Sequence, residues 1–101
     1  MTYYIYILYS QSSDIYYAGY TSDPERRLLE HNTSLRTTFT SKHRPWIIKV
    51  VYSCGEDETT AIKIERFTKK QKSRVLLEKL IAGTELKELL AQLVRVPHVR
   101  D

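Results

Sequence analysis

The stretch from Tyr16 to His31, YYAGYTSDPERRLLEH, brings tyrosine, arginine and histidine side chains close together in the chain. An arginine guanidinium is a permanently charged planar fork that suits phosphate oxygens, while tyrosine and histidine can accept or donate protons. Taken singly, a strand tyrosine usually packs, and a helical charge such as Arg27 or Glu65 is usually solvated. Together, separated by one short turn, these residue types are more typical of a functional site than of residues that only support the fold.

Two strands are predicted to carry the tyrosines. Tyr3 to Tyr9 is rich in β-branched and aromatic residues, which indicates a strand. A polar turn, Ser10 to Asp14, precedes a second strand from Ile15 to Tyr20, so that the two form a hairpin. Gly19 permits a backbone conformation, or a close approach of another group, that a side chain would obstruct.

A helix is predicted to follow directly and to carry the arginines. Asp23 is suited to the N-cap and Pro24 to the first helical position, and the helix is expected to run to about His31. Arg27 and His31 are four residues apart and therefore share one helix face. The buried stripe is expected to consist of Leu28 and Leu29.

The middle of the chain predicts a connection and a third strand. Asn32 to Arg44 is polar and basic, which favours an exposed connection with a short helix at most. Pro45 ends it, and the sequence WIIKVVY from Trp46 to Tyr52 predicts the third strand, with Trp46 in the core. Cys54 is expected to be a small apolar residue near the end of that strand.

A second helix is predicted from Glu58 to Lys72. The residues expected on its buried face are Ala61, Ile64, Thr68 and Gln71, with Ile62 beside them. Glu65 lies one turn after Ala61 and Ile62, at the edge of the face that packs on the sheet. The outer flank is expected to carry Arg66, Lys69, Lys70 and Lys72.

Two further helices and a tail complete the predicted order. Ser73 caps a short helix through Ile81 that Gly83 closes, and Thr84 caps a last amphipathic helix. The apolar face of that last helix contains Leu86, Leu89, Leu90 and Leu93. The tail after Val94 is expected to be frayed. We therefore predict an α+β fold, a small three-stranded antiparallel sheet flanked by helices, with residues 1–82 as the domain and 83–101 as a C-terminal helix and tail packed on it.

Composition narrows the class of partner. The 101 residues carry a formal net charge of +4 and a pI near 9.2, which mildly favours an anionic partner such as nucleic acid. Cys54 is the single cysteine, so no internal disulfide forms and no cysteine-based zinc site is suggested. No apolar run approaches the length of a membrane span. We expect a cytoplasmic protein with no membrane association.

The order of the motifs resembles that of the GIY-YIG nuclease domain, in particular its small stand-alone bacterial members. Tyr4-Ile5-Tyr6 and Tyr17-Ala18-Gly19 stand at its two signature positions, with Tyr6 and Tyr17 eleven residues apart and Arg27 ten further on. The remaining matching positions are Thr21, Asp23, His31 and Glu65. The resemblance covers about residues 2–80.

The resemblance implies a role for each of five residues. Tyr6 and Tyr17 would line the site, Arg27 would contact the scissile phosphate, Glu65 would be the single carboxylate that binds Mg²⁺ or Mn²⁺, and His31 matches a histidine or tyrosine position. A tyrosine acts as a base only if its pKa falls from about 10 toward neutrality, which a nearby arginine and a metal ion favour. We therefore assign Tyr17 as the base and Tyr6 as its hydrogen-bonding or water-positioning neighbour.

The resulting hypothesis is a metal-dependent endonuclease that hydrolyses DNA in DNA repair or processing, with structure-directed cleavage left open. RNA is left open as a substrate, and a monomer or weak homodimer is expected. The residues expected to contact nucleic acid are Arg26, Lys42, Arg44, Lys69, Lys70 and Lys72. The helical lysines are more often a solvated face than a nucleic-acid patch.

Departures from the family pattern leave alternatives open. Tyr4 replaces a glycine, Ala18 replaces the central residue of the second motif, and Tyr20 stands where several members carry a lysine. An asparagine that larger members carry beyond Glu65 is also missing. The alternatives are a nucleic-acid-binding relative with weak or no catalysis, and an interaction module in which the leucine-rich last helix mediates self-association.

Overall fold

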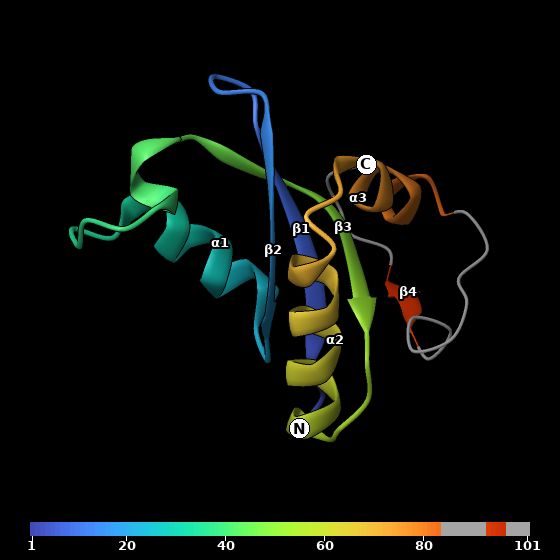
Figure 1. Ribbon diagram of the computed structural model, residues 1–101. Coiled ribbons are helices and arrows are strands. Elements are labelled where there is room, and N and C mark those ends of the chain that lie inside the picture. Colours follow the sequence, from blue (N-terminus) through green and yellow to red (C-terminus); the bar gives the residue numbers. More distant parts are fainter. Residues whose placement is uncertain (84–92, 97–101) are drawn as a thin grey trace.

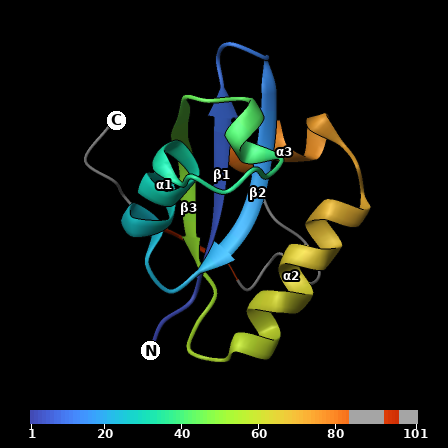
Figure 2. The same cartoon turned by 90° about the vertical axis from the view of Figure 1, so that its left-hand side faces the viewer.

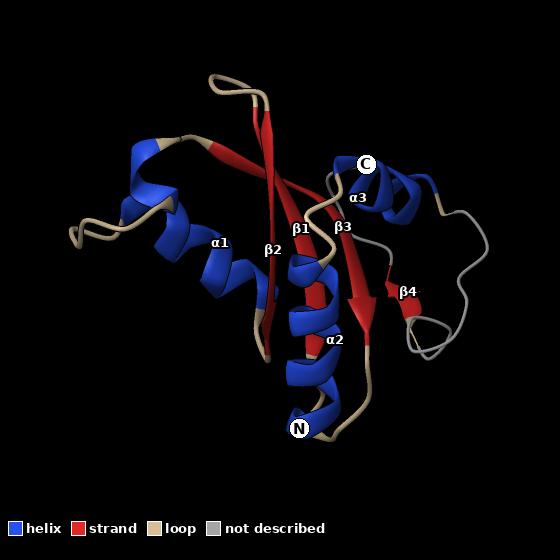
Figure 3. Ribbon diagram, in the orientation of Figure 1, coloured by secondary structure: helices blue, strands red, loops and turns tan. Residues whose placement is uncertain are grey.

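The fold is an antiparallel sheet with helices on both faces (Figures 1 and 3). The computed structural model describes residues 1–83 and 93–96. Its elements are β1 (Tyr4–Ser10), β2 (Ile15–Thr21), α1 (Pro24–Thr33), the 3₁₀ helix η1 (Thr40–Lys42), β3 (Trp46–Ser53), α2 (Glu58–Lys70), α3 (Arg74–Ala82) and β4 (Val94–Val96). The predicted α+β class, the hairpin, the third strand and the first three helices are confirmed.

The sheet contains one strand more than predicted. Its order is β2-β1-β3-β4, and each neighbouring pair is antiparallel. The expectation of a frayed tail after Val94 is wrong as far as Val96, because Val94 to Val96 pairs with Val51 to Ser53 of β3, and the rest of that tail lies outside the described residues. This strand is only three residues long, and its backbone groups pair with the otherwise free edge of β3, which a local pattern in the sequence does not reveal.

Side chains alternate between the two faces of the sheet, and both faces are covered. Ile5 and Ile7 of β1 belong to a core under α2 and α3, whereas Tyr6 and Leu8 belong to a second core on the other face, which α1 contributes to. Figure 2 shows α1 and α2 on opposite sides of the strands. Burial on both faces explains why β1 is apolar almost throughout.

Helix α1 begins as predicted but buries different residues. The Asp23 side chain accepts a hydrogen bond from the Arg26 amide, and Pro24 occupies the first turn. Leu29 was expected in the buried stripe, but its side chain is 61% exposed, and the buried residue of the helix is His31. The leucines alone do not show which face of α1 is buried. His31 can be buried because both of its ring nitrogens have hydrogen-bond partners inside the fold.

Helices α2 and α3 follow the predicted pattern closely. Ala61, Ile64 and Thr68 are buried as expected, but Gln71 is exposed because α2 ends at Lys70. Lys72 has a positive φ of 47° and therefore lies outside the helix. Ser73 caps α3, and a left-handed Gly83 closes it. Apart from Leu93, which is buried before β4, the predicted Thr84-capped helix lies outside the described residues.

Candidate active site

The predicted catalytic residues meet at the β2 edge of the sheet. Tyr6 and Tyr17 lie on neighbouring strands and project on the face that α1 covers. Arg27 and His31 come from α1, and Glu65 comes from α2 on the other face. Because β2 is the outermost strand, groups from both faces can reach its edge. The site therefore combines three segments of the chain that are distant in sequence.

Tyr6 is a buried phenol. Its side chain is 3% exposed, and its hydroxyl lies 2.8 Å from Nε2 of His31. Burial raises the pKa of Tyr6 far above its usual range, and the neighbouring Tyr17 acts in the same direction, while the positive charge of Arg27 opposes them. Tyr6 therefore remains protonated and acts as a hydrogen-bonding group.

Gly19 makes room for that phenol. It is the direct partner of Tyr6 across the β1–β2 ladder, and a Cβ at Gly19 would overlap the Tyr6 hydroxyl and Cζ. Its φ lies outside the left-handed region, so the requirement is for space and not for an unusual backbone conformation. The close approach expected from the sequence is confirmed.

Gly19→Ala is expected to lower the free energy of unfolding by about 1–3 kcal/mol, because an inserted methyl group must displace a buried ring. Denaturant titration measures this loss, and NMR of the His31 ring reports whether Tyr6 has moved. Gly55→Ala is the control, because Gly55 has a φ of +88° but no atom within 4 Å of an added Cβ. Gly55→Ala should lose stability through backbone strain alone and leave the His31 signals unchanged. Equal shifts of the His31 signals in both variants would contradict the steric explanation.

His31 connects Tyr6 to the loop after α1. Its Nδ1 lies 2.9 Å from the Thr40 hydroxyl, so both ring nitrogens have buried partners. Burial lowers the pKa of His31 to about 4, and the charge of Arg27 acts in the same direction. The imidazole is therefore neutral at pH 7, with one nitrogen donating and the other accepting. This arrangement holds the Tyr6 hydroxyl in one position.

Protonation of His31 should make stability depend on pH. The unfolded chain takes up a proton at this residue near pH 6.5, whereas the folded protein resists protonation until pH about 4. Stability is therefore lost as pH falls through this window, by roughly 3 kcal/mol for this residue. Denaturant titrations from pH 7 to pH 4 should show a steeper loss for the native protein than for His31→Gln. Parallel curves would show that the folded protein does not resist protonation of His31.

The ring of Tyr17 is surrounded by aromatic groups and one cation. His31 lies edge-on at 5.2 Å between ring centroids, and Phe39 stacks on it at 6.2 Å. Trp46 contacts it at 6.1 Å, and Nζ of Lys69 lies 4.7 Å from the ring centroid. Among the described residues, none forms a hydrogen bond with the Tyr17 hydroxyl. The ring is held in place while its hydroxyl stays available to a ligand.

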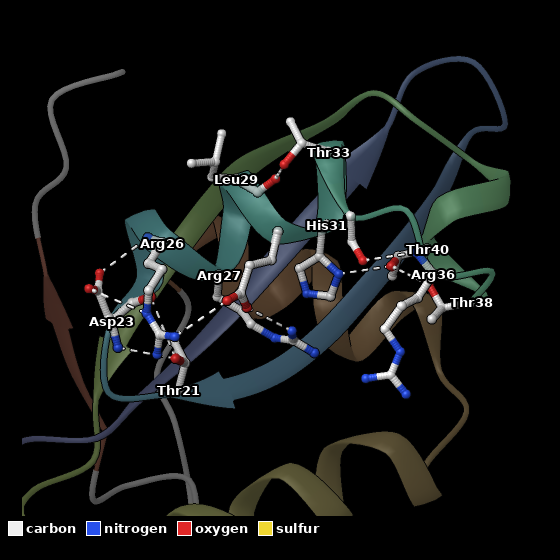
Figure 4. Close-up of polar contacts among 12 residues, drawn as sticks. Thr21, Asp23, Arg26, Arg27, Leu29, His31, Thr33, Arg36, Thr38 and Thr40 are labelled. Atoms are coloured by element: carbon white, nitrogen blue, oxygen red, sulfur yellow. Dashed lines mark hydrogen bonds and ion pairs between the residues drawn. The ribbon is translucent and has the colours of Figure 1, made fainter.

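Arg27 stands beside a hollow of about 480 Å³, which we call the site hollow. It is lined by Tyr17, Arg27, His31, Arg36, Phe39 and Thr40, among others. The Arg27 side chain is 42% exposed, and its NH1 donates to Glu30 at 3.0 Å. In Figure 4, Arg27 and His31 project from α1 on the same side, and Arg36 extends along that side from the following loop. Two guanidinium groups at one hollow favour an anionic ligand.

Glu65 is the candidate metal ligand. Its side chain is 21% exposed, and its Oε2 lies 3.7 Å from Nζ of Lys69. Its negative charge also acts on Tyr6 across the sheet edge. No group of three or more potential ligands (His, Cys, Asp or Glu) occurs in the described part of the chain. This donor set fits Mg²⁺, which usually keeps several waters and takes one or two carboxylates, and does not fit a closed protein cage.

The predicted nucleic-acid contacts do not form one continuous patch. Arg26 is paired with Asp23 and Glu30 on the outside of α1. Arg44 donates from Nε to the His31 carbonyl and from NH2 to the Ser34 carbonyl, which gives it a structural role in closing the loop. Arg26 and the four lysines of the set are exposed: Lys42, Lys69, Lys70 and Lys72. Contact with nucleic acid remains a prediction for all six.

Four residues of the site were missed by the sequence analysis: Glu30, Arg36, Phe39 and Thr40. Glu30 could have been found, because it lies three residues after Arg27 on the same helix. Phe39, an aromatic residue in a polar loop and 54% exposed, was the other available signal. Nothing in the local sequence distinguishes Thr40, which is buried against His31, from the neighbouring threonines.

Comparison with known proteins agrees with this geometry. The model of the GIY-YIG catalytic domain matches residues 2–79. The chain belongs to the GIY-YIG family. It is 37% identical to a UPF0213 protein of Enterococcus faecalis over 81 residues, which cover 74% of this chain and 90% of that protein. A UPF0213 protein of Listeria welshimeri is 36% identical over 69 residues, or 63% of this chain and 74% of the relative.

Membership of the GIY-YIG family places the chain in a nuclease superfamily. The chain carries a nuclease domain, and a nuclease domain takes nucleic acid as its substrate. GIY-YIG nucleases generally depend on a divalent metal ion, in agreement with the donor set at Glu65. Within the described ranges, 1–83 and 93–96, no helix is both long and apolar enough to cross a bilayer.

Proposed function

We propose that this protein is a metal-dependent endonuclease that hydrolyses DNA phosphodiester bonds and acts in the cytoplasm on branched or damaged DNA during repair. The observation that carries the proposal is the convergence of five residues at one sheet edge: Tyr6, Tyr17, Arg27, His31 and Glu65. Each side chain has an ordinary structural explanation alone. Three of them, Tyr17, Arg27 and His31, line the site hollow. The two guanidinium groups of Arg27 and Arg36 outnumber the one carboxylate of Glu30 there, which supports a phosphate-directed site.

Phosphodiester hydrolysis needs an activated water, stabilisation of negative charge on the phosphate, and assistance to the departing oxygen. Arg27 would bind non-bridging phosphate oxygens with its charged fork. Its partner Glu30 also lines the site hollow, but their ion pair is partly exposed and therefore weak enough for a phosphate to compete for the guanidinium. Tyr6 is held as a neutral phenol by burial and by His31. That leaves Tyr17, with its available hydroxyl, as the tyrosine that would take the proton of the attacking water.

Glu65 would hold the metal ion, and Mg²⁺ or Mn²⁺ bound there would act as a Lewis acid on the phosphate and the departing oxygen. His31 would contribute by position and not by proton transfer, because its neutral ring is fully engaged by Tyr6 and Thr40. Every residue of this proposed site comes from one chain. A monomer is therefore sufficient for the chemistry, with a weak homodimer also compatible.

A substrate panel tests the proposal directly. Purified protein is incubated with linear, nicked and branched DNA, and with matched RNA, in Mg²⁺ or Mn²⁺ and with a chelator as the control. We expect metal-dependent cleavage of at least one DNA, with branched or nicked substrates cut faster than intact duplex. If every substrate stays intact with both metals, the endonuclease proposal is abandoned.

A second candidate function is nucleic-acid binding with little or no catalysis. The pairing of Glu65 with Lys69 favours it, because that ion pair competes with a metal ion for the only carboxylate proposed to bind one. Salt-dependent DNA binding without turnover, unchanged in Glu65→Gln, would identify this alternative. Metal-dependent turnover would exclude it.

A further inference from the structure

Lys69 contacts two residues of the candidate site at once. On α2 it lies one turn after Glu65, and its Nζ is 3.7 Å from Oε2 of that carboxylate. The same Nζ lies 4.7 Å from the centroid of the Tyr17 ring. Its positive charge also contributes to the low pKa of His31. These contacts differ from those of an ordinary solvated helix charge, which has no specific partner beyond its own helix.

The position of Lys69 follows from the edge location of β2. Helix α2 covers one face of the sheet, and the Tyr17 ring belongs to the core on the other face. Lys69 spans this edge and lines a hollow of about 440 Å³ with Tyr17, Phe39, Lys72 and Arg74, among others. Tyr17 and Phe39 also line the site hollow, so the two hollows adjoin at these rings and the ammonium over Tyr17 lies at their boundary.

We propose that Lys69 is a further residue of the active site, with a position that depends on Glu65. In the free protein it holds the Glu65 carboxylate beside Tyr17. When Glu65 binds a divalent ion, the Lys69 ammonium is released to a non-bridging oxygen of the substrate phosphate. This inference rests on the proposed nuclease function and adds to it a second cation that contacts the substrate.

Physical chemistry supports an exchange of partners. The Lys69 side chain is 43% exposed and that of Glu65 is 21% exposed, so their ion pair is a weak one that is easily broken. A divalent cation on Glu65 cancels the attraction and repels the ammonium. The nearest new anion would be the phosphate beside Tyr17. The Lys69 ammonium already lies over the Tyr17 ring, so only a short movement of the charged end is needed to reach a phosphate there.

The first test measures metal binding without substrate. Mn²⁺ is titrated into the native protein, Lys69→Ala, Lys69→Arg and the control Lys63→Ala, with NMR line broadening at Glu65 as the signal. Lys63 lies on the exposed side of the same helix and outside the site. Removing the competing ammonium should tighten Mn²⁺ binding about twofold in Lys69→Ala. Lys69→Arg and Lys63→Ala should bind as the native protein does.

The second test measures DNA binding as a function of salt. A fluorescent duplex with a single-stranded arm is titrated with protein, either without divalent ions or with Ca²⁺. With Ca²⁺, the plot of the logarithm of the DNA association constant against the logarithm of the salt concentration should become less steep by about one in Lys69→Ala, because one phosphate contact is lost. Without divalent ions the slope should not change. In a Glu65→Gln background, where Lys69 has no carboxylate to hold it, the same loss should appear without Ca²⁺.

Two outcomes overturn the inference. If Lys69→Ala leaves both the Mn²⁺ affinity and the Ca²⁺ slope unchanged, Lys69 is a solvated helix charge. If the slope falls equally with and without Ca²⁺ in the native background, Lys69 binds phosphate independently of Glu65. Neither measurement requires cleavage, so a failure of the nuclease proposal in the substrate panel is distinguished from a failure of this one.

Discussion

Glu65→Gln is expected to lower metal-dependent DNA cleavage by about a thousandfold or more. A bound divalent ion contributes several kcal/mol of charge stabilisation in the transition state, and this contribution is lost when the only proposed protein ligand loses its charge. Stability should hardly change, because the interaction of this side chain within the described part of the chain is a partly exposed ion pair with Lys69. Single-turnover cleavage and denaturant titration measure the two effects.

The control for this change is Glu58→Gln. Glu58 is on the first turn of the same helix, and its carboxylate accepts a hydrogen bond from the Tyr20 hydroxyl at 3.1 Å, outside the site hollow. Glu58→Gln removes the same charge from the same helix. Cleavage should stay within about twofold of the native rate, because surface substitutions of this kind have small effects. Cleavage that survives Glu65→Gln would contradict the assignment of this carboxylate as the metal ligand.

Tyr17→Phe should reduce cleavage by roughly a hundredfold to ten-thousandfold, which is the range for removal of a general acid or base. The ring contacts with His31, Phe39 and Trp46 do not involve the hydroxyl, so the fold should be retained. The measurement is the pH profile of the single-turnover rate. The native protein should show a rise with pH that reports deprotonation of the base, and the variant should lose it.

Tyr6→Phe provides a matched contrast with the same chemical change. The Tyr6 hydroxyl is buried against Nε2 of His31, so its removal leaves a buried ring nitrogen without a partner. That should cost about 1–3 kcal/mol of stability, whereas Tyr17→Phe should cost much less. If Tyr6→Phe removes the pH dependence of the rate and Tyr17→Phe keeps it, the roles of the two tyrosines must be exchanged.

Local patterns in the sequence were reliable wherever the chemistry of one residue determines the backbone. Asp23 and Pro24 start α1 as expected, because a side-chain cap and a fixed φ act on the nearest turn. Ser73 and Gly83 bound α3 for the same kind of reason. The spacing from Tyr6 through Tyr17 to Arg27 indicated the family, and the domain match over residues 2–79 confirms it.

Patterns were less reliable where burial depends on distant partners. Leu29 is exposed and His31 is buried, the reverse of what hydropathy predicts, because His31 finds Tyr6 on β1 and Thr40 beyond the helix. The strand from Val94 to Val96 was missed because it is stabilised by the edge of β3. In both cases the deciding interaction is hydrogen bonding to a residue far away in the chain.

The sequence by itself therefore determined the order of the elements from β1 to α3, the family, and most of the residues that could act on a phosphate. Only the tertiary structure decided which role each of those residues is suited to. Burial at the β1–β2 ladder makes Tyr6 a neutral phenol, while the edge position of β2 leaves Tyr17 within reach of Lys69 from the opposite face. The physical reason is that ionisation and hydrogen bonding depend on solvent exposure and on neighbouring charges, which the fold brings together from separate segments.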